Sequence, residues 1–221
     1  MTYECIIFDL DDTLYPRNSG LMQEIGRRIQ EWLRDRLDLT WEDAVRLRRA
    51  YYSRYGTTLG GLVAEHDVDV QDYLAYVHDV PLEDYIASNL SLGAMLEAMP
   101  LRKIIHTNAS SDHGWRVLRV LGVSGYFETV IGIEEVGLRN KPHQDAYEQV
   151  LLALDAWGPD CIMVEDSARN LCSAKALGMT TVLVDALPDR SVDYVVDDVL
   201  QVGPVVSELL AGESKATGSR A

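Results

Sequence analysis

The sequence predicts an α/β fold: a doubly wound parallel sheet into which an all-helical domain is inserted. Two observations predict the sheet and a third predicts the insertion. From residue 101 onward, short apolar segments alternate with helical patterns, which is typical of right-handed strand–helix–strand crossovers. Residues 5–8 form another apolar run, which is too short for a helix and contains β-branched isoleucines. Residues 15–92, between these two parts, contain no strong strand pattern.

The composition is that of a globular protein, and it excludes some classes of partner. The chain has 221 residues, of which 47% are hydrophobic and 25% charged, and its formal net charge is −15. Nucleic-acid polymers and anionic membrane surfaces select for clustered Lys and Arg, so we expect neither as the main partner. An anionic small molecule is compatible with this charge if its site is locally positive.

Several features predict a cytoplasmic protein. The cysteines Cys5, Cys161 and Cys172 are an odd number and lack the spacing of a metal site, which favours reduced, structural thiols. No apolar segment approaches the ~20 residues of a membrane span. The N-terminus also lacks the basic start and apolar stretch of a signal peptide.

The inserted segment contains three expected helices. Apolar residues repeat at helical spacing over 21–33, which predicts the first helix. Thr40 is expected to cap the second helix, which continues to about Tyr55. The glycine-rich residues 56–61 are expected to interrupt it, and residues 70–78 to form the third helix. Because the insert directly follows the first strand, we expect it to lie over the strand ends as a lid.

The remaining elements define the core and the domain boundaries. We expect strands at 101–106, 129–133, 161–164, 180–184 and, at the edge, 194–196, with helices at 112–121, 144–154 and 168–177. The predicted domains are a discontinuous α/β core of residues 1–15 and 93–210, a helical cap of residues 16–92, and a frayed tail of residues 211–221.

The strand at 5–8 runs into three carboxylates, those of Asp9, Asp11 and Asp12. Ligands of open α/β sheets bind at the carboxyl ends of the strands, so this is where we expect a site. Asp9 and Asp11 are two residues apart, and an extended chain points such side chains to the same side. Converging carboxylates repel each other unless a cation or a proton lies between them. The alternative is a strand that ends in a solvated acidic turn.

Later strands of the predicted core also end in, or soon reach, particular polar residues. These are Thr107 and Asn108 after the strand at 101–106, Lys141 after the strand at 129–133, and Glu165 and Asp166 after the strand at 161–164. All are expected along one edge of the sheet. Taken singly, each has an ordinary explanation as a strand-end cap, a surface lysine or an acidic helix N-terminus. Their arrival in order at successive strand ends argues against coincidence.

Together these residues suit phosphoryl chemistry. The acidic members offer an all-oxygen ligand set for Mg²⁺, which binds few protein carboxylates and keeps several waters. They are Asp9, Asp11, Glu165 and Asp166. The Lys141 ammonium and the Thr107 hydroxyl suit the oxygens of a transferring phosphoryl group.

These residues resemble the four motifs of the haloacid-dehalogenase-like (HAD) hydrolase superfamily. The motifs are Phe8-Asp9-Leu10-Asp11-Asp12-Thr13-Leu14, Thr107-Asn108, Lys141-Pro142 and Glu165-Asp166-Ser167. The helical insert between the first two motifs is similar to the C1 cap of some members. Finer features resemble the pyrimidine 5'-nucleotidase branch, namely Leu14-Tyr15-Pro16, Tyr55-Gly56, Gly60-Gly61-Leu62, Lys141-Pro142-His143 and Asn170.

The resemblance implies a covalent mechanism. Asp9 would be the nucleophile and would form an aspartyl-phosphate. Asp11 would protonate the leaving oxygen and then deprotonate the attacking water. Thr107 and Lys141 would complete the catalytic set, and Asn108 would contact the substrate.

The resemblance also implies a Mg²⁺ cofactor. Asp9, Asp166 and the backbone carbonyl of Asp11 would hold the ion. Glu165 would bind it directly or through water, because superfamily members often have the shorter Asp at this position. Asn170 would orient a metal-bound water or Lys141 from outside the ligand set.

The expected function is Mg²⁺-dependent hydrolysis of small phosphate monoesters, most specifically of nucleoside 5'-monophosphates. Tyr51 and Tyr55 would then provide a stacking surface for the base, unless they pack in the core of the cap. The alternative substrates are other small metabolites, such as a sugar phosphate or phosphoglycolate. A haloacid dehalogenase is disfavoured because that reaction has no alkoxide for Asp11 to protonate. A non-catalytic binding protein is a further alternative, and the oligomeric state is left open.

Overall fold

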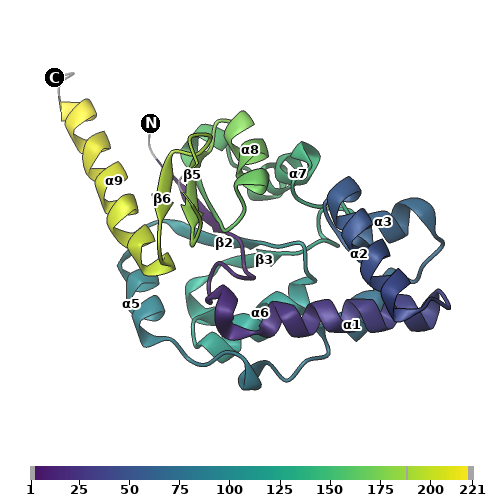
Figure 1. Cartoon of the computed structure of the whole chain (residues 1–221). Coiled ribbons are helices and arrows are strands. Elements are labelled where there is room, and N and C mark those ends of the chain that lie inside the picture. The colour runs from purple at the N-terminus through teal and green to yellow at the C-terminus, as the bar shows by residue number, and fades with distance from the viewer. Residues whose placement is uncertain (1–2, 188, 219–221) are drawn as a thin grey trace.

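The computed structural model describes residues 3–187 and 189–218, with side chains as far as residue 212. Its centre is a six-stranded sheet in the order β3-β2-β1-β4-β5-β6 (Figure 1). Neighbouring strands pair in parallel throughout. The strands are β1 (Cys5–Phe8), β2 (Arg102–His106), β3 (Thr129–Ile131), β4 (Cys161–Glu165), β5 (Thr180–Val184) and β6 (Tyr194–Val196). The predicted doubly wound parallel sheet is confirmed.

Strand β1 lies in the middle of the sheet because both of its faces are apolar. Ile6 and Phe8 join the hydrophobic cluster on one face, and Cys5 and Ile7 join the cluster on the other. The strands next to it are β2 and β4. Chain connections diverge on either side of such a strand, and its carboxyl end therefore opens into a crevice. Asp9 follows β1 at this point.

Helices cover both faces of the sheet. They are α1 (Leu21–Arg36), α2 (Trp41–Tyr55), α3 (Thr58–Glu65), α4 (Val70–His78), α5 (Leu90–Ala98), α6 (Ser111–Leu121), α7 (Gln144–Leu154), α8 (Ala168–Ala176) and α9 (Val202–Gly218). Side chains of α5, α6 and α9 pack on the face of Ile6, and those of α7 and α8 pack on the face of Ile7. None of the helices in the described residues has both the length and the apolarity to cross a membrane.

Helices α1 to α4 form a cap at one side of the core (Figure 1). They share a hydrophobic cluster of their own, centred on Trp32, Leu62 and Tyr73, which Ile133 joins from the core. The Trp32 and Tyr73 rings meet edge to face with their centroids 5.1 Å apart, a favourable aromatic geometry. Thr40 caps α2 by accepting a hydrogen bond from the Asp43 N–H, as the sequence predicted.

The glycine-rich segment 56–61 differs from its prediction as an interruption. Gly56 ends α2 at φ +86°, and α3 begins two residues later with Thr57 as its cap. Gly60 and Gly61 therefore lie inside a helix. A Cβ on Gly61 would lie 2.2 Å from Cγ of the Tyr51 ring. This glycine allows α3 to pack closely on α2, which local sequence cannot reveal.

Two helices of the core were not predicted. Helix α5 crosses the expected domain boundary between residues 92 and 93 and packs with α9 on the core. Leu92 and Leu96 are fully buried, and the segment is apolar on most sides, so its periodicity is weak. The tail predicted to fray from residue 211 is instead helical as far as Gly218, and its last three residues, 219–221, lie outside the described residues.

His106, the last residue of β2, generates a prediction about pH. Its ring is fully buried with its centroid 5.2 Å from that of Tyr147, and neither ring nitrogen has a partner among the described residues. Burial, and then the charge of Lys141, hold the pKa of His106 well below the ordinary 6.5. The unfolded chain therefore takes up this proton first, and the contribution of His106 to stability is lost as pH falls below about 6.5.

We predict that, from about pH 7 to pH 5, the free energy of unfolding falls more steeply in the wild type than in His106→Leu. The difference between the two slopes is roughly 1 kcal/mol per pH unit. Urea unfolding at each pH measures the difference. Carboxylates common to both proteins cancel in this comparison. Equal pH slopes would contradict the prediction.

Candidate active site

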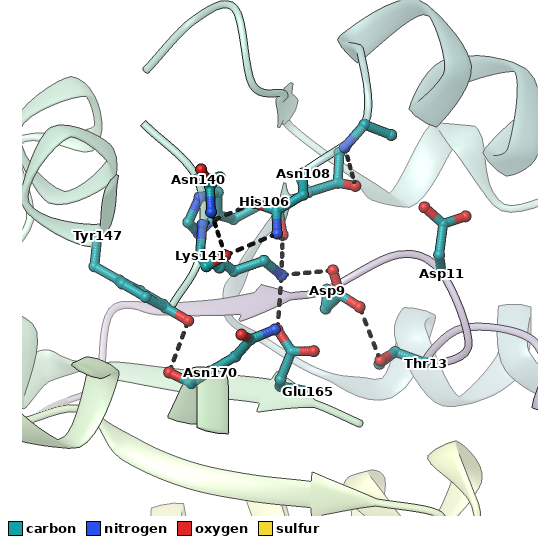
Figure 2. A network of polar contacts seen from close by, with 12 residues as sticks. Asp9, Asp11, Thr13, His106, Asn108, Asn140, Lys141, Tyr147, Glu165 and Asn170 are labelled. Carbon is teal, nitrogen blue, oxygen red and sulfur yellow. Dashed lines mark hydrogen bonds and ion pairs between the residues drawn. The ribbon is translucent and has the colours of Figure 1, made fainter. Parts of the chain in front are cut away.

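Asp9 is held at the carboxyl end of β1 by three hydrogen bonds, of which Figure 2 shows the two made by its side chain. Its backbone N–H donates to the Val164 carbonyl at 2.8 Å, which continues the pairing of β1 with β4. The Thr13 hydroxyl donates to Oδ2 at 3.2 Å, and the Lys141 ammonium donates to Oδ1 at 2.6 Å. Asp9 is 6% exposed, and these contacts fix the direction of its buried carboxylate.

Lys141 is a fully buried ammonium with three acceptors. Nζ donates to Asp9 at 2.6 Å, to Glu165 Oε2 at 2.7 Å and to the His106 carbonyl at 2.9 Å. An ammonium has three N–H groups, so all of them are used. Burial alone would lower the pKa of Lys141, but the two carboxylates outweigh it and raise this pKa. Lys141 is therefore a permanent positive charge between Asp9 and Glu165.

The backbone of Lys141 is positioned by two asparagines. The Asn108 side chain accepts from the Lys141 N–H at 2.8 Å and donates to the Lys141 carbonyl at 3.1 Å. Asn140 Nδ2 donates to the same carbonyl at 2.8 Å and to the Tyr55 carbonyl of the cap at 2.9 Å. Asn108, which we expected to contact substrate, thus fixes Lys141 and also lines the cavity described below.

Asp9, Glu165 and Asp166 bring carboxylate oxygens within 4.8 Å of one another. Burial, and then repulsion from Asp166 and Asp11, raise the pKa of Asp9 to about 6 against the opposing charge of Lys141. Burial and the Asp9 charge raise the pKa of Glu165 well above its usual value. Crowded acidic oxygens of this kind fit a hard divalent cation, which would relieve their repulsion. Of the expected metal-binding residues, these three bring their side chains together.

Asp11 lies apart from this acidic cluster. Its Oδ1 accepts from the Tyr15 hydroxyl at 2.5 Å and lies 3.4 Å from His113 Nε2. The His113 ring stacks on that of His78 with centroids 4.3 Å apart. Burial would raise the pKa of Asp11, but His113 and Tyr15 outweigh it and lower that pKa. The side chain is thus held as an oriented carboxylate beside the cluster and not within it.

A cavity of about 540 Å³ separates the cap from the core. Asp11, Asn108 and Asn170 line it from the core side. The opposite wall belongs to the cap and is mostly apolar; it includes Ile25, Ile29, Leu59, Leu74 and Val77 together with Arg48, Arg49 and Tyr52. A small ligand in this cavity would contact both domains.

The cap tyrosines expected to bind substrate do not line this cavity. Tyr51 is 4% exposed, packs against Gly61 and bonds through its hydroxyl to Glu65 and His66. Tyr55 donates its hydroxyl to Glu65 at 2.5 Å. Both belong to the packing of α2 against α3. Their contacts therefore favour a role in the core of the cap over stacking on a base. The tyrosine of this helix that lines the cavity is Tyr52.

Two other predicted residues occupy supporting positions. Thr107 is 2% exposed and its Oγ1 accepts from the Ala109 N–H at 3.0 Å, so its hydroxyl proton stays available for a ligand. Asn170 lines the cavity, and its backbone carbonyl accepts from the Tyr147 hydroxyl at 2.8 Å. No side-chain hydrogen bond from Asn170 to Lys141 occurs in the described structure.

Sequence reasoning missed several residues that shape the site. Thr13 lies four residues after Asp9 within the same motif, and its spacing could have suggested the contact. Tyr15 and His113, which orient Asp11, and Asn140, which joins the cap to Lys141, come from segments with no common pattern. Arg17 also reaches the acidic cluster, where its Nη2 donates to Asp166 at 2.5 Å.

The structure combines a doubly wound parallel sheet, a buried lysine–carboxylate cluster at the ends of its strands, and the inserted helices α1 to α4 beside that cluster. Residues 3–178 match the family model for haloacid dehalogenase-like hydrolases, and the chain belongs to this family.

Relatives of this chain have several activities. A glyceraldehyde 3-phosphate phosphatase of Methanocaldococcus jannaschii is 26% identical over 92% of this chain and 97% of its own. A HAD phosphatase from Thermococcus onnurineus has a similar structure, with a TM-score of 0.61 at 18% identity over 92% of this chain and 97% of that one. L-2-haloacid dehalogenase from Xanthobacter autotrophicus has a TM-score of 0.59 at 18% identity, over 93% and 99% of the two chains. At such identities the two structures support the fold alone.

We predict that Lys141→Gln lowers the free energy of unfolding by about 3–5 kcal/mol, because it leaves two buried carboxylates without their cation. The matched control is Lys175→Gln, which breaks an exposed pair with Asp193 at 2.9 Å and should cost at most ~1 kcal/mol. Denaturant unfolding near neutral pH measures both. Similar losses in the two variants would show that the buried pairing contributes little.

Proposed function

We propose that this protein is a metal-dependent phosphomonoester hydrolase acting on small phosphorylated metabolites through an aspartyl-phosphate. The observation that carries the proposal is the position of Asp9. This carboxylate is oriented by Lys141 and Thr13, lies beside two further carboxylates, and is two residues from Asp11, which lines the cavity. Membership of the family and the phosphatase among its relatives support the same reaction.

In the first step, an Asp9 carboxylate oxygen attacks phosphorus, and the bond from phosphorus to the ester oxygen breaks. Asp11 in its acid form gives its proton to the leaving alcohol oxygen. The dianionic phosphate next to Asp11 raises the pKa of this carboxyl relative to the ligand-free protein, which favours the acid form. The Lys141 ammonium offsets negative charge on the Asp9 side of the reacting group.

In the second step, water attacks the phosphorus of the aspartyl-phosphate and the bond to Asp9 breaks. Asp11, now a carboxylate, takes the proton of this water. The hydrogen bond from Tyr15 and the contact with His113 keep the Asp11 carboxylate oriented between the steps. Inorganic phosphate and the free Asp9 carboxylate are the products.

Asp9, Glu165 and Asp166, with the Asp11 carbonyl as a proposed further ligand, would hold Mg²⁺. The ion supplies charge stabilisation for the phosphoryl oxygens. Arg17 contacts Asp166 at 2.5 Å and is 50% exposed, so it can hold this carboxylate without blocking it from solvent. We also propose that the protein works in the cytoplasm.

A small substrate without an aromatic base is the better fit to the cap wall. Tyr51 and Tyr55, which would have stacked on a base, are used in the packing of α2 on α3. The cavity is lined mainly by aliphatic side chains and by Arg48 and Arg49, and the aromatic rings on its wall are those of Tyr52, Tyr73 and His78. A sugar phosphate or a similar three- to six-carbon phosphate ester is therefore our first proposal for the substrate.

Nucleoside 5'-monophosphates, and pyrimidine nucleotides in particular, are the second candidate. Tyr52 lines the cavity with an exposed ring and offers one stacking surface. The sequence features shared with pyrimidine 5'-nucleotidases favour the same substrates. Haloacid dehalogenation is disfavoured because that reaction does not need the oriented carboxylate of Asp11. A non-catalytic role is disfavoured because the chain has a suitable residue at each expected catalytic position.

We predict that Asp9→Asn lowers kcat for phosphate monoesters by roughly 10³-fold or more, because the amide cannot form the acyl phosphate. Asp12→Asn is the matched control. Its carboxylate belongs to the same turn but lies near Arg17, at 3.9 Å, and outside the acidic cluster. Steady-state kinetics and the thermal midpoint of both variants give the comparison. Substantial turnover by folded Asp9→Asn would exclude Asp9 as the nucleophile.

The substrate class is tested with a panel of phosphate monoesters in the presence of Mg²⁺. We expect sugar and triose phosphates to give higher kcat/KM than UMP or CMP, and EDTA to abolish the activity. Higher values for the pyrimidine nucleotides would establish the second candidate. Turnover of 2-haloacids that is indifferent to EDTA would replace the phosphatase with a dehalogenase.

A further inference from the structure

Arg48, on the cap wall of the cavity, is a charged side chain without a protein partner. It makes no hydrogen bond or ion pair with any other described residue, and no carboxylate affects its pKa. It is half-buried and lines the cavity that also contains Asp11. In a chain with 35 acidic and 20 basic residues, an arginine without an acidic partner is unexpected.

The packing around Arg48 holds its guanidinium in the cap. A Cβ on Gly26 of α1 would lie 2.6 Å from Nη2 and 2.9 Å from Cζ of Arg48. The guanidinium therefore lies against the α1 backbone at a position where a larger residue would displace it. Gly26 is buried inside a helix, where alanine is intrinsically favoured by roughly 0.5–1 kcal/mol. Its presence is explained by the space it leaves for Arg48.

The electrostatic surroundings of Arg48 are unfavourable in the absence of a ligand. Burial lowers the pKa of Arg48 most, Tyr73 raises it, and the neighbouring charge of Arg49 lowers it. Arg49 lines the same cavity and has no ion pair in the described structure either. Nearby walls are apolar and include Leu74 and Val77, which strengthens any charge interaction in the cavity. An anion here would compensate the half-buried charge of Arg48 and lie near the exposed charge of Arg49.

We propose that Arg48, assisted by Arg49, binds a second anionic group of the substrate at the end opposite to the phosphate that is cleaved. This proposal rests on the proposed phosphatase function and narrows its substrate class to small phosphate monoesters that carry an additional carboxylate or phosphoryl group. Arginine guanidinium groups bind carboxylates and phosphoryl groups alike through paired hydrogen bonds. The phosphate ester lies at the acidic cluster, and the distal anion lies on the cap.

A distal anion bound by the cap would link the cap to the core, where the phosphate ester binds. A substrate with charges at both ends would extend from Arg48 on the cap to the acidic cluster around Asp9 on the core. A neutral distal group would fill the cavity without compensating the two arginines. The net charge of −15 also makes this local positive wall the feature that attracts a dianionic ligand toward the crevice.

The test compares two substrates that differ only in the distal group. 3-Phosphoglycerate has a carboxylate where glycerol 3-phosphate has a hydroxymethyl group. We expect the wild type to prefer 3-phosphoglycerate in kcat/KM, and Arg48→Gln to reduce this preference about tenfold, mainly through KM. Comparing kcat/KM for fructose 1,6-bisphosphate and fructose 6-phosphate tests whether a second phosphoryl group can take the place of the carboxylate.

Two further variants separate anion binding from a structural role. Arg46→Gln removes an exposed arginine of the same helix that pairs with Asp43, and it should keep the wild-type preference. Gly26→Ala displaces the Arg48 side chain while leaving its charge, and it should reduce the preference in a folded protein. A loss that is equal for both substrates, or no preference in the wild type, would overturn the proposal.

A binding measurement distinguishes failure of the subsite from failure of the catalytic proposal. Calorimetry on Asp9→Asn compares the affinities of 3-phosphoglycerate and glycerol 3-phosphate without turnover. Tighter binding of 3-phosphoglycerate, lost when Arg48→Gln is added, supports the subsite even if the wild type hydrolyses neither compound. Hydrolysis of p-nitrophenyl phosphate by the wild type, together with equal affinities in calorimetry, would retain the phosphatase and reject the subsite.

Discussion

The carboxyl edge of this sheet depends on one buried ammonium group, that of Lys141. Asp9 and Glu165 need a positive charge between them, because burial raises the pKa of both carboxyl groups and the charge of Asp9 raises that of Glu165 further. Lys141 supplies that charge from a loop beyond β3, while the two acids follow β1 and end β4. The ion pairs therefore join three segments that lie far apart in the sequence. They also arrange the group that we propose as nucleophile.

The loop that carries Lys141 also links the core to the cap. Asn140 and His143 both contact the Tyr55 carbonyl at the end of α2, and Arg169 donates to the Tyr52 and Ser53 carbonyls. Gly56 follows with φ +86°, and a Cβ there would lie 2.5 Å from Asn140 Nδ2. The end of a cap helix is thus in contact with the residues that position Lys141. A change in the placement of the cap would reach Lys141 through this contact.

The fold was predictable to a large extent because its signals are local. The strands at 180–184 and 194–196 and the helix at 144–154 agree with the structure at both ends. Segment α5 was missed because it is apolar on most sides, and α3 because its glycines suggested a loop. In both cases tertiary burial, and not local propensity, explains the helix. The gathering of Asp9, Lys141, Glu165 and Asp166 at one edge could also be anticipated, since parallel strands end on the same side of a sheet.

The sequence by itself determined the parallel sheet, the insertion of a helical cap and the set of polar residues at the strand ends, because strand period, helix period and chain order are properties of short segments. Tertiary structure decided which side chains line the cavity. Tyr51 and Tyr55 point into the packing of α2 on α3, whereas Tyr52 and Arg48 on the same helix line the cavity. A rotation of about 100° per residue separates these positions, and only the contacts between α1, α2 and α3 fix which of them is turned toward the core.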